Sequence, residues 1–213
     1  MRILIMGAGA HGQALADLAG EDTVHSPVAF TDADPALKGQ SVLGIPVWGD
    51  DTAGISAFQE GRCEGMVVGV GNTGMAARRR VFELALSHGI PAPALVHSRA
   101  VVARSASVGA GTVVFGGTVL AARVRVGRNA VLYSGAIVEH DCRLADHAYL
   151  GPGVVLAGGV TVGEGAFLGA GAVVLPHLAI GAGAMVAAGA VVTEAVAAGA
   201  TVAGVPARAH IRI

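Results

Sequence analysis

The sequence predicts two domains, an α/β domain over residues 1–95 and an all-β parallel β-helix over residues 96–213. An aliphatic residue recurs at every sixth position of the second half, and this period predicts the β-helix. Strand-like runs that end in glycine and precede helix-like segments predict the α/β domain. The composition suits a turn-rich chain, because 33 of the 213 residues are glycine and only 4% are aromatic.

The six-residue repeat holds for sixteen consecutive sampled positions. These positions are Val102, Val108, Val114, Leu120, Val126, Leu132, Val138, Leu144, Leu150, Leu156, Val162, Leu168, Val174, Ile180, Val186 and Val192. A period of six fits neither a helix nor a simple strand, but it fits one short strand followed by one tight turn. Three such units close a coil of about 18 residues, and the sixteen units therefore predict about five stacked coils.

Residues 1–95 alternate strand-like and helix-like segments. Residues 2–6 read as a strand that leads into a GxGxxG turn, Gly7-Ala8-Gly9-Ala10-His11-Gly12, and then into a helix. Residues 28–30 and 66–70 read as further strands, followed by Asp32 and Gly71, and residues 75–88 read as a helix. This order predicts a half-sized Rossmann-like sheet, whose strand C-termini are where open parallel sheets bind ligands.

The GxGxxG turn is open to three interpretations. It fits NAD binding, with Asp32 placed for a ribose hydroxyl, although the segment is short for a complete dinucleotide fold. A half-sized domain could instead hold one nucleotide, such as that of an activated sugar. The glycines could also serve only the close packing of the helix on the strand.

Charge, cysteine usage and hydropathy exclude several classes of protein. The net charge of −1 gives no basic field for nucleic acid or an anionic membrane. Cys63 and Cys142 lack zinc-ligand or disulfide spacing and suit a reducing compartment. Residues 165–193 carry no charged residue, but their glycines and periodic pattern argue against a membrane span. The first residues lack the basic region of an export signal, so we expect a cytoplasmic protein.

One histidine stands in a setting that suits catalysis. His140 lies between two carboxylates, Glu139 and Asp141, on a predicted turn of the β-helix. A carboxylate can fix the imidazole tautomer and raise its basicity, as a general base requires. Gly158 follows one coil later (158 − 140 = 18) and should stack beside His140, where its amide could hold an oxyanion. Tyr149 is half a coil away from His140 and should lie on another edge.

These features together resemble the sialic acid O-acetyltransferase and nucleotide-sugar N-acetyltransferase family of hexapeptide-repeat acyltransferases. The resemblance covers nearly the whole chain and is strongest to the N-acetyltransferases of GDP-perosamine and UDP-linked 4-amino sugars. It rests on GAGAHG at residues 7–12, the stretch around VWGDD, VGVGN at residues 68–72, VEHDC at residues 138–142, LAGG at residues 156–159 and GVPAR near the end.

The resemblance implies a left-handed β-helix and a homotrimer with acetyl-CoA lying between neighbouring subunits, and it implies no metal. It gives His140 as general base, Asp141 as its orienting partner and Gly158 as the amide that faces the thioester carbonyl. It places the nucleotide sugar against Gly9, Ala10, His11, Asp32 and Gly71. It places CoA near Tyr149, Gly158, Ala170, Ala188 and Arg208. Many relatives carry a second histidine where this sequence has Tyr149.

The expected reaction is acetyl transfer from acetyl-CoA to the amino group of a nucleotide-linked amino sugar of the 4-amino-4,6-dideoxy type, for bacterial surface glycan or glycoprotein synthesis. Three alternatives remain at this point. The acceptor could be a hydroxyl of sialic acid or another sugar. A γ-type carbonic anhydrase shares the β-helix but needs three zinc-binding histidines, of which His140 and His147 are an incomplete set. The chain could also be a non-catalytic trimeric sugar-binding scaffold.

Overall fold

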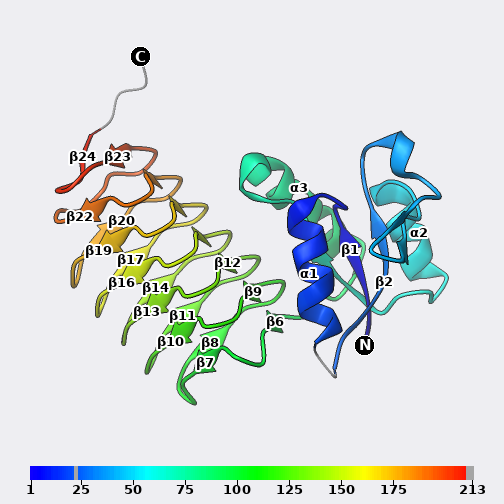
Figure 1. The fold of residues 1–213 in the computed structure, drawn as a ribbon, viewed down its shortest axis with the longest axis horizontal. Helices are drawn as coiled ribbons and strands as arrows, with labels where there is room; N and C mark the ends of the chain where they lie inside the picture. The colour runs from blue at the N-terminus through cyan, green and yellow to red at the C-terminus, as the bar shows by residue number, and fades with distance from the viewer. Residues whose placement is uncertain (22–23, 210–213) are drawn as a thin grey trace. The chain divides into compact units, whose positions relative to one another are not determined.

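The computed structural model describes residues 1–21 and 24–209 and divides the chain into two compact units, Met1–His97 and Ser98–Ile213 (Figure 1). The first unit is an α/β domain with a parallel sheet, and the second is a parallel β-solenoid. The predicted fold class is therefore confirmed. This division follows residue 97, whereas the sequence predicts a boundary after residue 95. Within the described residues, no helix combines the length and the apolar character needed to cross a membrane.

The first unit is built on a three-stranded parallel sheet in the order β2–β1–β5. Its strands are β1 (Arg2–Met6), β2 (Ser26–Thr31) and β5 (Gly65–Val68). Its helices are α1 (Ala10–Gly20), α2 (Asp51–Gln59) and α3 (Met75–Ser87), with 3₁₀ turns at Pro35–Leu37 and Asn72–Gly74. A hairpin joins β3 (Ser41–Val42) to β4 (Ile45–Pro46), and β6 (Leu95–Val96) comes last. Leu4, Met6, Met66, Phe82 and Ile90 are among the buried side chains of the core.

Glycines bring β1, α1 and the end of β5 into close contact. Gly7 has a φ of 118°, which favours glycine. A Cβ on Gly12 would collide with the Gly7 carbonyl, and a Cβ on Gly69 would lie 2.9 Å from the Gly12 Cα. The interpretation of the GxGxxG turn as a packing device is therefore right for these positions. Gly9 is different, because nothing lies within 4 Å of a Cβ built there.

The second unit stacks two-residue strands into three faces, which we call the first, second and third face (Figure 1). The first face holds β7 (Val101–Val102), β10 (Val119–Leu120), β13 (Ile137–Val138), β16 (Val155–Leu156), β19 (Val173–Val174) and β22 (Val191–Val192). The second face holds β8 (Ser107–Val108), β11 (Arg125–Val126), β14 (Arg143–Leu144), β17 (Thr161–Val162) and β20 (Ala179–Ile180).

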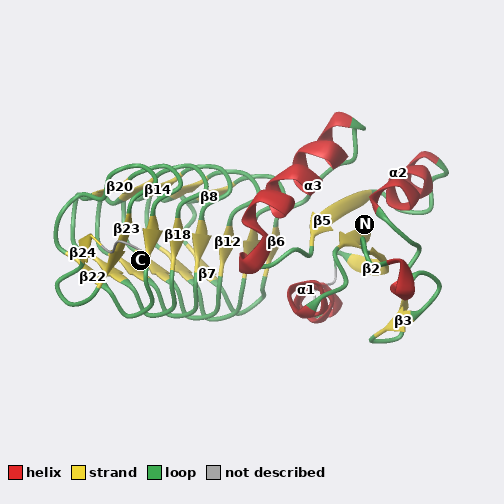
Figure 2. Cartoon of the chain, turned by 90° about the horizontal axis from the view of Figure 1, so that it is seen from above, coloured by secondary structure: helices red, strands yellow, loops and turns green. Residues whose placement is uncertain are grey.

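The third face holds β9 (Val113–Val114), β12 (Val131–Leu132), β15 (Tyr149–Leu150), β18 (Phe167–Leu168), β21 (Met185–Val186) and β23 (Thr201–Ala203). An antiparallel strand, β24 (Arg208–Ala209), ends this face. Figure 2 shows β8, β14 and β20 of the second face in one row and β12 and β18 of the third face in another.

Each coil advances by 18 residues, so that a residue pairs with the one 18 positions later, as Val119 with Ile137 and Val155 with Val173. From β9 to β22 the second residue of each strand is buried, and Leu120, Val138 and Leu156 are fully buried. The predicted inward positions of the repeat are therefore confirmed from Val114 to Val192, whereas Val102 at the start of the stack is 37% exposed. The stack continues past the last sampled repeat position to β23, where Met185 pairs with Thr201 after only 16 residues. A strict six-residue period does not predict this shorter last coil.

Three turns per coil join the faces, and we name each set by one member. The His140 corner (residues 121–124, 139–142, 157–160 and 175–178) joins the first face to the second. The His147 corner (residues 127–130 and 145–148) joins the second to the third. The Ala170 corner (residues 151–154, 169–172 and 187–190) joins the third to the first. The third residue of these turns has a positive φ, which explains the frequent glycines there.

Candidate active site

His140 follows β13 at the corner between the first and second faces. Its side chain is 56% exposed, and its Nδ1 lies 2.9 Å from Oδ2 of Asp141. Asp141 takes the positive-φ position of the turn, with a φ of 64°, and this geometry turns its carboxylate back toward His140. Asp is among the few residue types that adopt this conformation at modest cost. The local turn thus sets the imidazole and its partner side by side.

Asp141 is also held by an arginine from the preceding coil. Arg123 donates from Nε to Oδ1 at 2.6 Å and from Nη2 to Oδ2 at 2.8 Å. The hydrogen bonds from Arg123 and then from His140 hold the pKa of Asp141 well below its usual range. Because an ionised carboxylate only accepts hydrogen bonds, the neutral imidazole must carry its proton on Nδ1. Its Nε2 is then the basic atom.

Gly158 lies directly beside this imidazole, one coil later in the same corner. A Cβ on Gly158 would be only 2.8 Å from both Cε1 and Nε2 of His140. The register is fixed by a backbone hydrogen bond from the Gly159 amide to the His140 carbonyl, at 2.9 Å. The basic nitrogen of His140 therefore lies against a stretch of backbone that carries no side chain. The predicted juxtaposition of His140 and Gly158 is present within one chain.

The other residues expected to contact CoA lie elsewhere on the solenoid. Tyr149 is on the third face, only 4% exposed, and its ring stacks on Phe167 with ring centroids 5.3 Å apart. Ala170 and Ala188 form a column in the Ala170 corner, where the Gly189 amide donates to the Ala170 carbonyl at 2.8 Å. Arg208 lies on β24. One chain alone does not bring these residues to His140.

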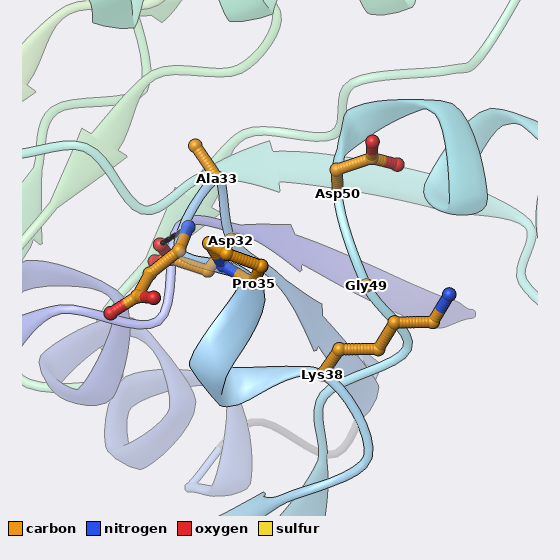
Figure 3. A pocket seen from close by; sticks show the side chains of 7 residues that line it. Asp32, Ala33, Pro35, Lys38, Gly49 and Asp50 are labelled. Carbon is orange, nitrogen blue, oxygen red and sulfur yellow. Dashed lines mark hydrogen bonds between the residues drawn. The ribbon is translucent and has the colours of Figure 1, made fainter.

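The α/β domain has a pocket of about 240 Å³ at the C-terminal end of β2 (Figure 3). It is lined by Asp32, Ala33, Asp34, Pro35, Lys38, Gly49 and Asp50. The Asp32 carboxylate accepts hydrogen bonds from the amides of Ala8 (2.8 Å) and Asp34 (3.0 Å). Asp32 thus ties the glycine turn to this pocket, at the edge where parallel sheets bind ligands.

The remaining predicted substrate residues gather at the start of α1 rather than around that pocket. His11 is 7% exposed, and a Cβ on Gly71 would lie 3.3 Å from the His11 Cβ. Burial, and secondly the charge of Arg78, lower the pKa of His11 to about 3. The buried Arg78 donates to the Val68 carbonyl at 2.7 Å and lies 3.3 Å from His11 Nε2. Gly9 and Ala10 mark the boundary between β1 and α1.

Comparison with known proteins identifies both units. The PglD N-terminal domain matches residues 2–84, and the bacterial transferase hexapeptide (six repeats) matches residues 123–158 and 159–194. A variant of perosamine N-acetyltransferase from Caulobacter crescentus, in complex with CoA and GDP-perosamine, is 35% identical, with a TM-score of 0.93 over 100% of this chain and 98% of that one. The chain belongs to the hexapeptide-repeat family of nucleotide-sugar N-acetyltransferases.

Two further solved structures superpose as well. The acetyltransferase domain of PglB from Neisseria gonorrhoeae, in complex with acetyl coenzyme A, is 32% identical, with a TM-score of 0.91 over 98% of each chain. WeeI from Acinetobacter baumannii is 26% identical, with a TM-score of 0.86 over 99% of this chain and 100% of that one. A search of curated proteins found no match. As a member of this family, the chain is an acetyl-CoA-dependent sugar N-acetyltransferase.

The sequence does not predict several residues that lie near His140 or near His11. Arg123 stands 18 residues before Asp141, a spacing that pairs opposite charges on adjacent coils and that the sequence already displays. Arg78 carries no such signal, because only the fold brings α3 beneath the end of β5. Cys142 follows Asp141, but burial raises the pKa of its thiol, so the thiol stays protonated. Within residues 1–21 and 24–209, no three histidine, cysteine or acidic side chains cluster as a metal site would require.

Proposed function

We propose that this enzyme transfers the acetyl group of acetyl-CoA to the amino group of a nucleotide-linked 4-amino-4,6-dideoxy sugar, with His140 as general base. The observation that carries the proposal is the imidazole of His140, oriented by Asp141 and set 2.8 Å from the Cβ position of Gly158. The complexes of similar proteins with CoA, acetyl-CoA and GDP-perosamine support the same pairing of donor and acceptor. The product would serve bacterial surface glycan or glycoprotein synthesis.

The neutral amine attacks the thioester carbonyl carbon, and a C–N bond forms as the carbonyl π electrons move to oxygen. His140 Nε2 accepts the proton that the amine loses, and Asp141 stabilises the imidazolium that results. The intermediate collapses with cleavage of the C–S bond, and the proton passes to the sulfur that leaves. The products are the N-acetyl sugar and CoA with a free thiol.

The amide of Gly158 is the proposed donor to the oxyanion. Its carbonyl is occupied by the amide of His177 at 2.9 Å, whereas its own N–H donates to no backbone carbonyl among the described residues. The absence of a side chain lets the thioester approach the backbone closely. Preorganised amide donors of this kind supply much of the rate enhancement in acyl transfer.

A homotrimer would complete the site. The outward residues of the first face are all aliphatic (Val101, Val119, Ile137, Val155, Val173 and Val191), whereas the second face presents Ser107, Arg125, Arg143, Thr161 and Ala179. An aliphatic face that is 63% exposed at Val101 and 36% at Ile137 is typical of a protein interface. Packing of first faces about a threefold axis would set the His140 corner of one subunit opposite the Ala170 corner of the next.

This arrangement explains how CoA would reach the reacting group. The His140 corner and the Ala170 corner border the first face on its two sides. Acetyl-CoA would therefore run along Ala170 and Ala188 of one subunit, with Arg208 toward its phosphates, and present its thioester to His140 of another. Tyr149, on the third face, would support this arrangement through the ring stack that it forms with Phe167.

The α/β domain would bind the nucleotide sugar at the C-terminal edge of its sheet, with Gly9, Ala10, His11 and Gly71 on one side and Asp32 on the other. Gly9 leaves room for a diphosphate at the start of α1, where helix amides favour anions. The free thiols of Cys63 and Cys142 and the use of acetyl-CoA support a cytoplasmic location.

The replacement His140→Ala tests the assignment of the base. We expect turnover, measured by thiol release from acetyl-CoA, to fall by about a hundredfold or more, since general base catalysis contributes on the order of 10²–10⁴. The assembly should keep its mass and melting temperature. The control is His88→Ala, because the His88 side chain, within the described part of the chain, bonds to Ser87 and Leu84 at the end of α3. Turnover close to that of the wild type would remove His140 from the mechanism.

A further inference from the structure

His177 lies in the next coil along the chain and contacts the turn at Gly158 and Gly159, which carries no side chains. It stands 18 residues after Gly159 (177 − 159 = 18), and its amide donates to the Gly158 carbonyl at 2.9 Å. Its ring lies where a side chain on Gly159 would be, with Cε1 2.9 Å from that Cβ position and Nδ1 closer still. The imidazoles of His140 and His177 therefore flank the Gly158–Gly159 backbone on its two sides.

His177 has a backbone conformation that is uncommon for a residue other than glycine. Its φ is 59°, in the left-handed region where Gly159, the equivalent residue one coil earlier, is glycine. Other non-glycine residues at such turn positions are paired across coils, as Arg123 is with Asp141 and Asn129 with His147. The His177 side chain makes no hydrogen bond or ion pair within the described part of the chain. Its presence at this turn position therefore points to a ligand.

An equivalent turn indicates where an oxygen bound to the Gly158 amide would lie. Arg128 holds the same second position of its turn, and its amide donates to Oδ1 of Asp146, one coil later, at 2.7 Å. By the regularity of the repeat, we expect the N–H of Gly158 to be open to an acceptor on the side of the coil that carries Pro176 and His177. An acceptor on that amide would therefore sit on the His177 side of the turn, opposite His140.

We propose that His177 is a second donor to the thioester carbonyl oxygen, which it shares with the amide of Gly158. As the amine adds to the carbonyl carbon, negative charge develops on this oxygen, and the His177 N–H and the Gly158 N–H both stabilise it. The proton of the amine goes to His140 and then to the departing sulfur, so His177 neither gains nor loses a proton. This inference rests on the function proposed above.

Two variants separate this role from a structural one. His177→Gly removes the ring and suits a φ of 59°, as the neighbouring glycines do. His177→Asn tolerates the same φ and keeps an N–H donor. We expect His177→Gly to lower kcat by about tenfold to a hundredfold, with KM for acetyl-CoA and the melting temperature nearly unchanged. His177→Asn should recover a substantial part of kcat.

The measurement is thiol release with saturating acceptor and varied acetyl-CoA, on the intact assembly, beside the wild type and His140→Ala. A wild-type enzyme that acetylates no amino sugar contradicts the proposed function and overturns the inference together with it. An active wild type with an equally active His177→Gly overturns the inference alone. A rise in KM at constant kcat also overturns it, because that change marks uniform binding of CoA. Equal losses in both variants with a lowered melting temperature assign His177 to the fold and overturn it too.

Discussion

Among single residues, Arg123 holds the Asp141 carboxylate in place beside His140. Arg123 contacts both oxygens of this carboxylate, at 2.6 and 2.8 Å. Arg123→Gln removes this bidentate contact, so the carboxylate is held less firmly against the imidazole. We expect kcat, measured by thiol release from acetyl-CoA, to fall by about threefold to tenfold.

The chain offers a matched control for Arg123→Gln. Arg128 forms an equivalent pair with Asp146 in the His147 corner, at 2.8 Å, away from His140. Arg128→Gln should leave kcat unchanged while costing similar stability. An unchanged kcat in Arg123→Gln, or an equal loss of kcat in both variants, would contradict the positioning role of Arg123.

His11 links the stability of the α/β domain to pH. Its pKa is about 3 in the folded chain, because the ring is buried and lies near Arg78, and about 6.5 in an unfolded chain. The unfolded state therefore binds more protons between these values, and stability falls as pH drops through this window. Between pH 7 and pH 5 the free energy of unfolding should fall by about 2 kcal/mol from this residue.

Urea unfolding of the wild type and of His11→Gln at both pH values measures this contribution. Other groups titrate in both proteins, so the difference between the two pH responses isolates His11. The variant should lose about 2 kcal/mol less than the wild type on acidification. Identical responses would mean that His11 is not held neutral by its surroundings.

Among elements, the turn at residues 157–160 must stay bare for the His140 imidazole to lie on it. Gly158→Ala would place a methyl group 2.8 Å from the ring, so the ring must rotate away from the backbone. We expect kcat to fall by about tenfold or more, with the coil register and melting temperature retained. Gly20→Ala is the control, since nothing lies within 4 Å of a Cβ there. Full activity in Gly158→Ala would show that the contact is not used.

The elements also show which parts of the structure a sequence can predict. The strands from β7 to β22 follow from one aliphatic residue in six, because each coil buries that residue against its neighbours. The contact of His140 with Gly158 follows from the same period. Helix α2 was missed, although Asp50 caps it by accepting from the Ala53 amide at 3.0 Å. The side chain of His177 was missed because its ring position depends on a positive φ that no local pattern reveals.

For the whole molecule, the aliphatic first face makes association testable. Val155→Asp places a charge on this face, and a buried unpaired charge is costly at an interface. We expect the variant to run as a monomer in light scattering, whereas the wild type runs as a trimer. Thr161→Asp, one strand later on the second face, is the control and should remain a trimer. A trimeric Val155→Asp would show that another surface holds the subunits together.

The central claim is that the amino group of a nucleotide-linked amino sugar accepts the acetyl group at the His140 corner. Thiol release from acetyl-CoA, measured with UDP-, GDP- and dTDP-linked 4-amino-4,6-dideoxy sugars and with their 4-hydroxy counterparts, tests it most directly. We predict release with at least one amino sugar, a product heavier by one acetyl group, and no release with the matching hydroxyl sugar. Release with the hydroxyl sugars alone, or with none of the panel, would contradict the account.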